Sequence, residues 1–104
     1  MSNPDLVQYI VEQAGKTGEI RARKMFGDYA LYCNDKVVGL ICDNYLYLKP
    51  FQSLEPLLHE DDKHMKPPYD GAKLHYVITD IDDADYVSLL VKRVSENLPI
   101  KKNA

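Results

Sequence analysis

Basic and aromatic residues gather in one short stretch of the chain, Arg21-Ala-Arg-Lys-Met-Phe-Gly-Asp-Tyr-Ala-Leu-Tyr32. Lysine and arginine side chains bind phosphate groups, and aromatic rings stack on unpaired bases, so this composition could contact nucleic acid. If the stretch begins as a β-strand, however, alternation places Arg21 and Arg23 on one face and Lys24 on the other. The stretch also differs from the signature of RNA-recognition domains, because Met25 stands where that signature has glycine. A local nucleic-acid patch stays open as one alternative function.

The two cysteines of the sequence, Cys33 and Cys42, could form a disulfide or hold a metal ion. A hairpin turn at Asn34-Asp35 would place the two thiols about six residues apart along the paired strands, or roughly 20 Å. That distance is too long for a disulfide bond. We therefore expect two half-buried, reduced thiols.

The histidines and the clustered carboxylates have spacings that do not suit known metal motifs. His59 and His64 are five positions apart, whereas two ligands on one helix face are four apart. His75 alternates with apolar residues along a strand pattern. The cluster Asp80-Ile-Asp-Asp-Ala-Asp85 lacks the glycine and the glutamate that a calcium-binding loop requires, and its carboxylates suit a helix N-terminus instead. We expect no metal site.

No catalytic signature occurs in the sequence, which has no Gly-x-Ser-x-Gly motif, no phosphate-binding glycine loop and no dinucleotide fingerprint. We therefore expect no catalytic residue and no cofactor. An enzyme or small-ligand domain stays open as a second alternative. It would require a concave apolar pocket that contains a histidine or a carboxylate with a shifted pKa.

The elements that must position these residues follow from the hydrophobic period. Apolar residues recur at helical spacing near the N-terminus, where Asn3 is a suitable N-cap. From Ile20 the period changes to two, and turn-forming pairs separate short strands. A second helical pattern begins at Ala84, with Asp80 or Asp82 as its cap. The expected elements are a helix over 4–14, strands over 20–26, 29–33, 36–42 and 45–49, a short helix over 51–59, a loop over 59–71, a strand over 73–79 and the final helix.

This order, α-β-β-β-β-α-β-α, predicts an α+β domain in which helices cover one face of an antiparallel sheet. A chain of 104 residues has the size of one domain, so we expect residues 1–104 to form a single domain. The formal net charge is −3 and neither half of the chain is basic, so bulk charge does not favour nucleic acid. The sequence has no apolar run of about 20 residues and no signal-peptide pattern, so we expect a cytoplasmic protein without membrane contact.

Four segments carry a resemblance to a known family: Arg23-Lys-Met-Phe-Gly27, Tyr29-Ala-Leu-Tyr32, Val38-Gly-Leu-Ile41 and Leu46-Tyr-Leu-Lys49. Together they resemble the N-terminal domain of the TfoX/Sxy family of competence regulators, over nearly the whole chain. The resemblance implies a two-layer fold similar to type III secretion chaperones, and a regulatory role with partners in the transcription machinery. It also implies a stand-alone copy, because full-length regulators of the family continue into a C-terminal helical domain.

The resemblance changes the interpretation of the first stretch. Met25, Phe26 and Gly27 would mainly form a tight turn between two strands, with Phe26 packed against the helices. Strand alternation would bring basic residues and tyrosines to the sheet face away from the helices. There they form the candidate interaction surface: Arg21, Arg23, Tyr45, Tyr47 and Lys49, with Lys24 near a strand end. We expect this aromatic and basic surface, without a deep pocket, to bind a protein partner or a second copy in a non-enzymatic regulatory or adaptor domain.

Overall fold

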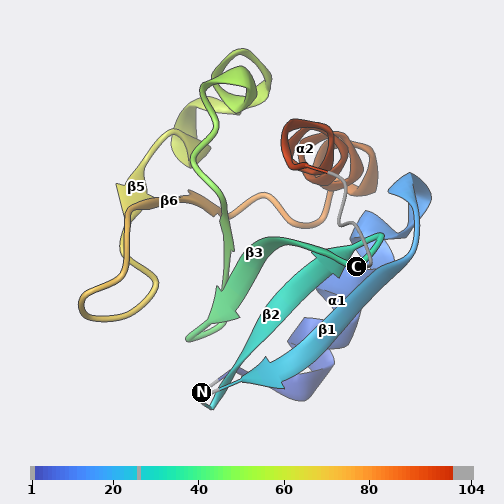
Figure 1. Cartoon of the computed structure of the whole chain (residues 1–104), viewed down its shortest axis with the longest axis vertical. Helices are drawn as coiled ribbons and strands as arrows, with labels where there is room; N and C mark the ends of the chain where they lie inside the picture. Colours follow the sequence, from blue (N-terminus) through green and yellow to red (C-terminus); the bar gives the residue numbers. More distant parts are fainter. Residues whose placement is uncertain (1, 26, 100–104) are drawn as a thin grey trace.

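The computed structural model describes residues 2–25 and 27–99. A six-stranded antiparallel sheet has the order β1-β2-β3-β4-β6-β5, and two α-helices pack on one of its faces (Figure 1). The strands are β1 (Ile20–Met25), β2 (Asp28–Cys33), β3 (Lys36–Cys42), β4 (Tyr45–Leu48), β5 (Met65–Lys66) and β6 (His75–Ile78). The helices are α1 (Pro4–Ala14) and α2 (Ala84–Asn97), with short 3-10 helices η1 (Gly15–Thr17), η2 (Gln52–Leu57) and η3 (Glu60–Asp62). The predicted α+β class and antiparallel sheet are confirmed. Neither α-helix has the length and apolar character needed to cross a membrane.

Tight turns set the register of the first four strands. Asn34-Asp35 and Asp43-Asn44 have φ angles between 49° and 67°, which is the backbone of a two-residue hairpin turn. Asparagine and aspartate adopt this left-handed conformation more readily than other non-glycine residues do. Gly27, with a φ of 85°, lies in the turn between β1 and β2, where a side chain would be strained. The predicted packing of Phe26 lies outside the described residues.

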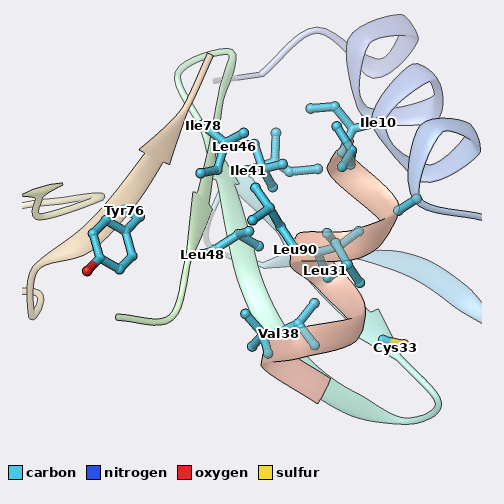
Figure 2. Packing of buried hydrophobic residues seen from close by; sticks show 14 of the residues in the cluster. Ile10, Leu31, Cys33, Val38, Ile41, Leu46, Leu48, Tyr76, Ile78 and Leu90 are labelled. Atoms are coloured by element: carbon cyan, nitrogen blue, oxygen red, sulfur yellow. The ribbon is translucent and has the colours of Figure 1, made fainter. Parts of the chain in front are cut away.

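The main core lies between the helices and one face of the sheet. Figure 2 shows Ile10 of α1 and Leu90 of α2 in one cluster with Leu31, Ile41 and Leu46 of the sheet. Each of these five side chains is at most 1% exposed. Burial of such a side chain stabilises the fold by about 1.5–3 kcal/mol. Because both helices share this cluster, they cover the same face and leave the opposite face without an α-helix.

The N-cap of α2 is Asp83, not Asp80 or Asp82 as the sequence predicts. The Asp83 carboxylate accepts a hydrogen bond of 3.1 Å from the backbone N–H of Tyr86. Asp83 has the extended backbone that an N-cap requires, and spacing alone does not single out one residue within a run of carboxylates. The Asp82 carboxylate instead accepts a hydrogen bond from the hydroxyl of Tyr9, which ties α1 to the start of α2.

The segment between β4 and β6 is more structured than its sequence predicts. The short helix expected over 51–59 is the 3-10 helix η2, in which Pro56 lacks a backbone donor. The loop expected over 59–71 contains η3 and the short strand β5, which pairs with β6 through Met65 and Tyr76. Two residues are too few to show strand alternation, so the sequence pattern does not reveal β5.

Candidate interaction surface on the open sheet face

A continuous row of residues crosses five strands on the face away from both helices. Arg23 pairs with Ala30, Ala30 with Leu40, Leu40 with Tyr47, and Tyr47 with Val77. Directly paired residues in an antiparallel sheet point to the same face, so these five side chains lie side by side. Members of this row form a hydrophobic cluster that is separate from the main core. We call this side of the sheet the open face.

The centre of the open face is packed even though no α-helix covers it. Tyr47 and Cys42 are each 5% exposed, Val77 is 7% exposed, and Leu40 packs against them. The sequence predicts Tyr47 as part of an exposed surface, and this exposure is wrong. The reason lies in its neighbours, because Leu40 and Val77 flank Tyr47 on the two adjacent strands. Tyr47 therefore packs within the open face and is not available for contact with a partner.

Large apolar side chains around this centre remain exposed. Met25 is 41% exposed, Tyr45 is 48% exposed and Tyr69 is 61% exposed. Met25 and Tyr69 line a hollow of about 360 Å³ together with Leu40 and Cys42. Tyr45 pairs with Cys42 and so lies beside this hollow. The sequence does not connect Tyr69 with this face, because the loop between β5 and β6 has no strand pattern.

Arg21 is the most strongly paired of the basic residues of β1. Its guanidinium donates to the carboxylate of Asp35, and its Nε lies 3.7 Å from a carboxylate oxygen of Glu19. The guanidinium carbon also lies 5.8 Å from the centre of the Tyr32 ring, a cation–π contact. Two carboxylates thus offset the charge of Arg21, which leaves little of it for a phosphate group.

The other basic residues of the candidate surface are distributed over different places. Arg23 is exposed on the open face, and Lys24 is exposed on the helix side, where it pairs with Tyr29 across the hairpin. Neither residue makes an ion pair within the described ranges of the chain. Lys49 is half-buried and lines a separate hollow with Val37. The structure therefore does not combine these cations into one patch.

The thiol of Cys42 is held in its protonated form. Burial raises its pKa to about 11, and the nearby carboxylates of Asp28 and Asp43 add to the shift. A protonated thiol is a weak nucleophile. Cys33 belongs to the main core on the opposite face, and both thiols are free. Both cysteines are at most 5% exposed, so the predicted half-burial is wrong.

A second cluster of titratable residues lies where η3 meets β6 and α2. Asp62 is fully buried, and its carboxylate accepts hydrogen bonds from the N–H and hydroxyl of Thr79, at 2.9 and 2.6 Å, and from the hydroxyl of Tyr86, at 2.8 Å. The ring of His59 stacks on that of Tyr86 at 3.7 Å, and its Nδ1 lies 2.8 Å from Asp80. Burial and the hydrogen bond to Asp62 raise the pKa of Tyr86.

The hydrogen bonds of this cluster stabilise the fold by joining separate segments of the chain. Within the part of the chain that the structure describes, every buried side-chain nitrogen and oxygen has a hydrogen-bond partner. Likewise, no group of three or more histidine, cysteine and carboxylate side chains among the described residues could hold a metal ion. Through Asp62 the cluster connects η3 to α2 and to the residue that follows β6.

Comparison with known proteins agrees with this architecture. The family model described as the TfoX N-terminal domain matches residues 12–96, a range that contains all six strands and nearly all of α2. An uncharacterized 12.7 kDa protein in the trpE 5′ region of Spirochaeta aurantia is 36% identical over 95 residues, which cover 90% of this chain and 81% of that protein. The TfoX N-terminal family is not a known enzyme family. By the extent of both matches, the chain belongs to the TfoX N-terminal domain family.

Proposed function

We propose that this chain is a non-enzymatic regulatory or adaptor domain of the competence-regulator type, and that it acts through protein–protein contacts on its open face. The observation that carries the proposal is the set of exposed apolar side chains around a packed centre, namely Met25, Tyr45 and Tyr69. Contiguous exposed apolar groups mark interaction sites, and methionine and aromatic residues are enriched there. Membership of the TfoX N-terminal family supports the regulatory part of the proposal.

The surroundings of the hollow also suit a protein interface. Arg23 lies in the row that runs through the apolar centre, at its β1 end, and arginine is a frequent hot-spot residue. The centre is already packed around Tyr47, so binding would need to order few additional side chains. An exposed tyrosine such as Tyr45 can become a hot spot when it is buried, where its truncation costs about 2 kcal/mol or more.

Two features of the hollow support a non-enzymatic role. The nucleophile in its lining is Cys42, whose pKa of about 11 keeps the thiol protonated. The carboxylate in its lining is Asp28, one oxygen of which accepts hydrogen bonds from the hydroxyl of Ser2, at 3.1 Å, and from the backbone N–H of Asp43, at 3.3 Å. The thiol is thus a weak nucleophile, and the carboxylate already accepts hydrogen bonds within the protein.

Site-specific photo-crosslinking in living cells tests this proposal. A benzophenone amino acid replaces Tyr45 on the open face, or replaces Leu89 on α2 as a control that is 43% exposed on the helix layer. We expect discrete protein adducts from position 45 that resist nuclease, no equivalent adducts from position 89, and a lower yield at position 45 when Met25→Ser is added. Equal adducts at both positions, or nuclease-sensitive adducts at position 45, would overturn the proposal.

A further inference from the structure

Strand β1 forms one edge of the sheet, because among the strands that the structure describes it pairs with β2 alone (Figure 1). The N–H of Asn34 donates to the carbonyl of Glu19 at 2.9 Å, so residues 19 and 34 are a hydrogen-bonded pair. Hydrogen-bonded and non-bonded pairs alternate along an antiparallel ladder, so the odd-numbered residues of β1 are the ones that bond to β2. The backbone groups of Ile20, Ala22 and Lys24 therefore point away from β2. Within residues 2–25 and 27–99, nothing bonds to the backbone groups of these three residues.

An apolar groove lies beside this edge on the helix side. It has a volume of about 450 Å³ and is formed between α1 and β1. Val7 and Val11 of α1 line it together with Ile20 and Ala22 of β1 and Tyr29 of β2. Ile20 and Ala22 are only partly buried, so the groove still has apolar surface that a neighbouring strand could cover.

The edge carries positive charge and no carboxylate. The sequence of β1 is IRARKM, and its three basic side chains are all exposed. Glu19 and Asp35 already offset Arg21, whereas Arg23 and Lys24 make no ion pair within the described residues. A segment that lies along this edge would therefore meet uncompensated positive charge, which favours carboxylates in that segment.

We propose that the β1 edge binds an extended acidic segment of a partner protein by strand addition. The backbone of the segment bonds to the free groups of Ile20, Ala22 and Lys24. Its alternate side chains then point to opposite faces. Apolar side chains enter the groove beside α1, and carboxylates on the open face lie opposite Arg23. This inference rests on the proposed adaptor function and names the kind of segment that the adaptor recognises, but it uses the edge of the sheet and not the open face.

A second copy of this chain fits the edge poorly in the registers centred on residues 21 to 24. Antiparallel self-pairing centred on Ala22 places Arg21 opposite Arg23. Self-pairing centred on residue 21, 23 or 24 places two identical cations opposite each other. Like charges that are directly opposite destabilise a sheet. Basic residues thus protect the edge from self-association, as is common for exposed edge strands, and leave it available to an acidic strand.

Backbone amide hydrogen exchange, read by NMR on the full chain, tests this inference directly. The probe is the acetylated and amidated peptide Glu-Val-Glu-Val-Glu-Val, and the matched control is Glu-Glu-Glu-Val-Val-Val, which has the same composition without alternation. With the probe at 100 times its Kd, exchange at Ala22 and Lys24 should slow by about 100-fold. The amides of Arg21 and Arg23 already bond to β2, so their exchange should change less. The control peptide should leave all four amides unchanged.

Three variants separate strand addition from simple charge attraction. Ala22→Pro removes one outward N–H and suits an edge strand, so it should abolish binding, whereas Ala22→Ser keeps that N–H and should bind as the parent does. Arg23→Glu keeps the fold even if the proline variant does not. This variant should bind the acidic probe about two- to fivefold more weakly than the parent does, and it should bind the peptide Lys-Val-Lys-Val-Lys-Val more tightly than the acidic probe.

The outcomes also distinguish this inference from the proposed function. Equal binding by the alternating and block peptides, or unchanged exchange at Ala22 and Lys24, would overturn strand addition. That result would leave photo-crosslinks from position 45 intact, because Tyr45 lies on the open face. Conversely, exchange protection at β1 without crosslinks at position 45 would overturn the open-face contact and support the edge alone.

Discussion

The buried carboxylate of Asp62 leads to the most demanding prediction about stability. Asp62 is fully buried, and its carboxylate accepts hydrogen bonds from two groups of the exposed residue Thr79 and from the hydroxyl of buried Tyr86, at 2.6 to 2.9 Å. Asp62→Ala removes the acceptor, which leaves the buried hydroxyl of Tyr86 without a partner and leaves the two donors of exposed Thr79 to water. A buried unsatisfied donor costs about 1–3 kcal/mol, and each lost bond to Thr79 costs about 0.5–1.5 kcal/mol, of which water recovers part, so we expect a loss of about 2–4 kcal/mol. That loss is a large share of the about 5–15 kcal/mol that stabilises a typical domain.

A double-mutant cycle isolates the bond between Asp62 and Tyr86. Tyr86→Phe removes one donor to Asp62 and the acceptor for the backbone N–H of His59, at 3.0 Å, and should cost about 1–3 kcal/mol. The Asp62–Tyr86 bond is lost in both single variants, so the double variant should cost less than their sum. We expect a coupling free energy of about 1–2 kcal/mol.

Guanidinium unfolding followed by tyrosine fluorescence and circular dichroism measures these free energies, since the chain has eight tyrosines and no tryptophan. The matched control is Asp61→Ala, the exposed neighbour in η3, which should change stability by no more than about 0.5 kcal/mol. If Asp62→Ala costs less than about 1 kcal/mol, or if the two losses simply add, the argument from buried donors is refuted.

Three further predictions concern the sheet. In Gly39→Ala the new Cβ would collide with the carbonyl oxygen of Tyr47, so β3 and β4 must separate and thermal unfolding should show a loss of at least about 2 kcal/mol. A loss below about 0.5 kcal/mol would contradict so close an approach of the two strands. The rate of Cys42 alkylation should be low at pH 8 and rise toward pH 11, because the pKa of the buried thiol is about 11. Because burial raises this pKa above the unfolded value of about 8.5, the thiol stabilises the fold fully below about pH 8.5, and this contribution is lost as the pH rises through 11. Cys42→Ala should lack this loss of stability. In fluorescence-anisotropy titrations with mixed DNA and RNA probes, we expect no saturable binding even at low salt. The nucleic-acid alternative would be favoured instead if binding were saturable and salt-sensitive, and if it disappeared when the three basic residues of β1 were replaced by alanine.

The first half of the fold could be predicted well because its signals are local. Asn3 accepts a hydrogen bond of 2.9 Å from the N–H of Asp5, and α1 runs over the predicted 4–14. The hairpin turns at Asn34-Asp35 and Asp43-Asn44 need only the residues in the turns themselves, so β3 has its predicted bounds of 36–42. In each case the residues that determine the element are neighbours in the sequence.

The parts that could not be predicted depend on residues far apart in the sequence. Asp62 is buried because its donors come from Thr79, which follows β6, and from Tyr86 of α2, and a carboxylate within a polar stretch gives no sign of this. Tyr69 joins the open face only because its loop folds back toward the hollow that Cys42 also lines. Whether Tyr47 is exposed depends on the strands beside β4, and alternation within β4 reports only its face.

The basic residues of β1 are divided between the two faces of an edge strand, which disfavours nucleic-acid binding and suits strand addition. A phosphate backbone would need Arg21, Arg23 and Lys24 together, but the two arginines and the lysine point to opposite faces, and carboxylates already pair with Arg21. An added strand has the same alternation as β1, so it requires one set of contacts on each face. Arg23 supplies a cation on the open face, the groove lined by Ile20 and Ala22 supplies apolar contacts on the other, and the free backbone lies between them. The arrangement that weakens the case for nucleic acid is therefore the arrangement that strand addition needs.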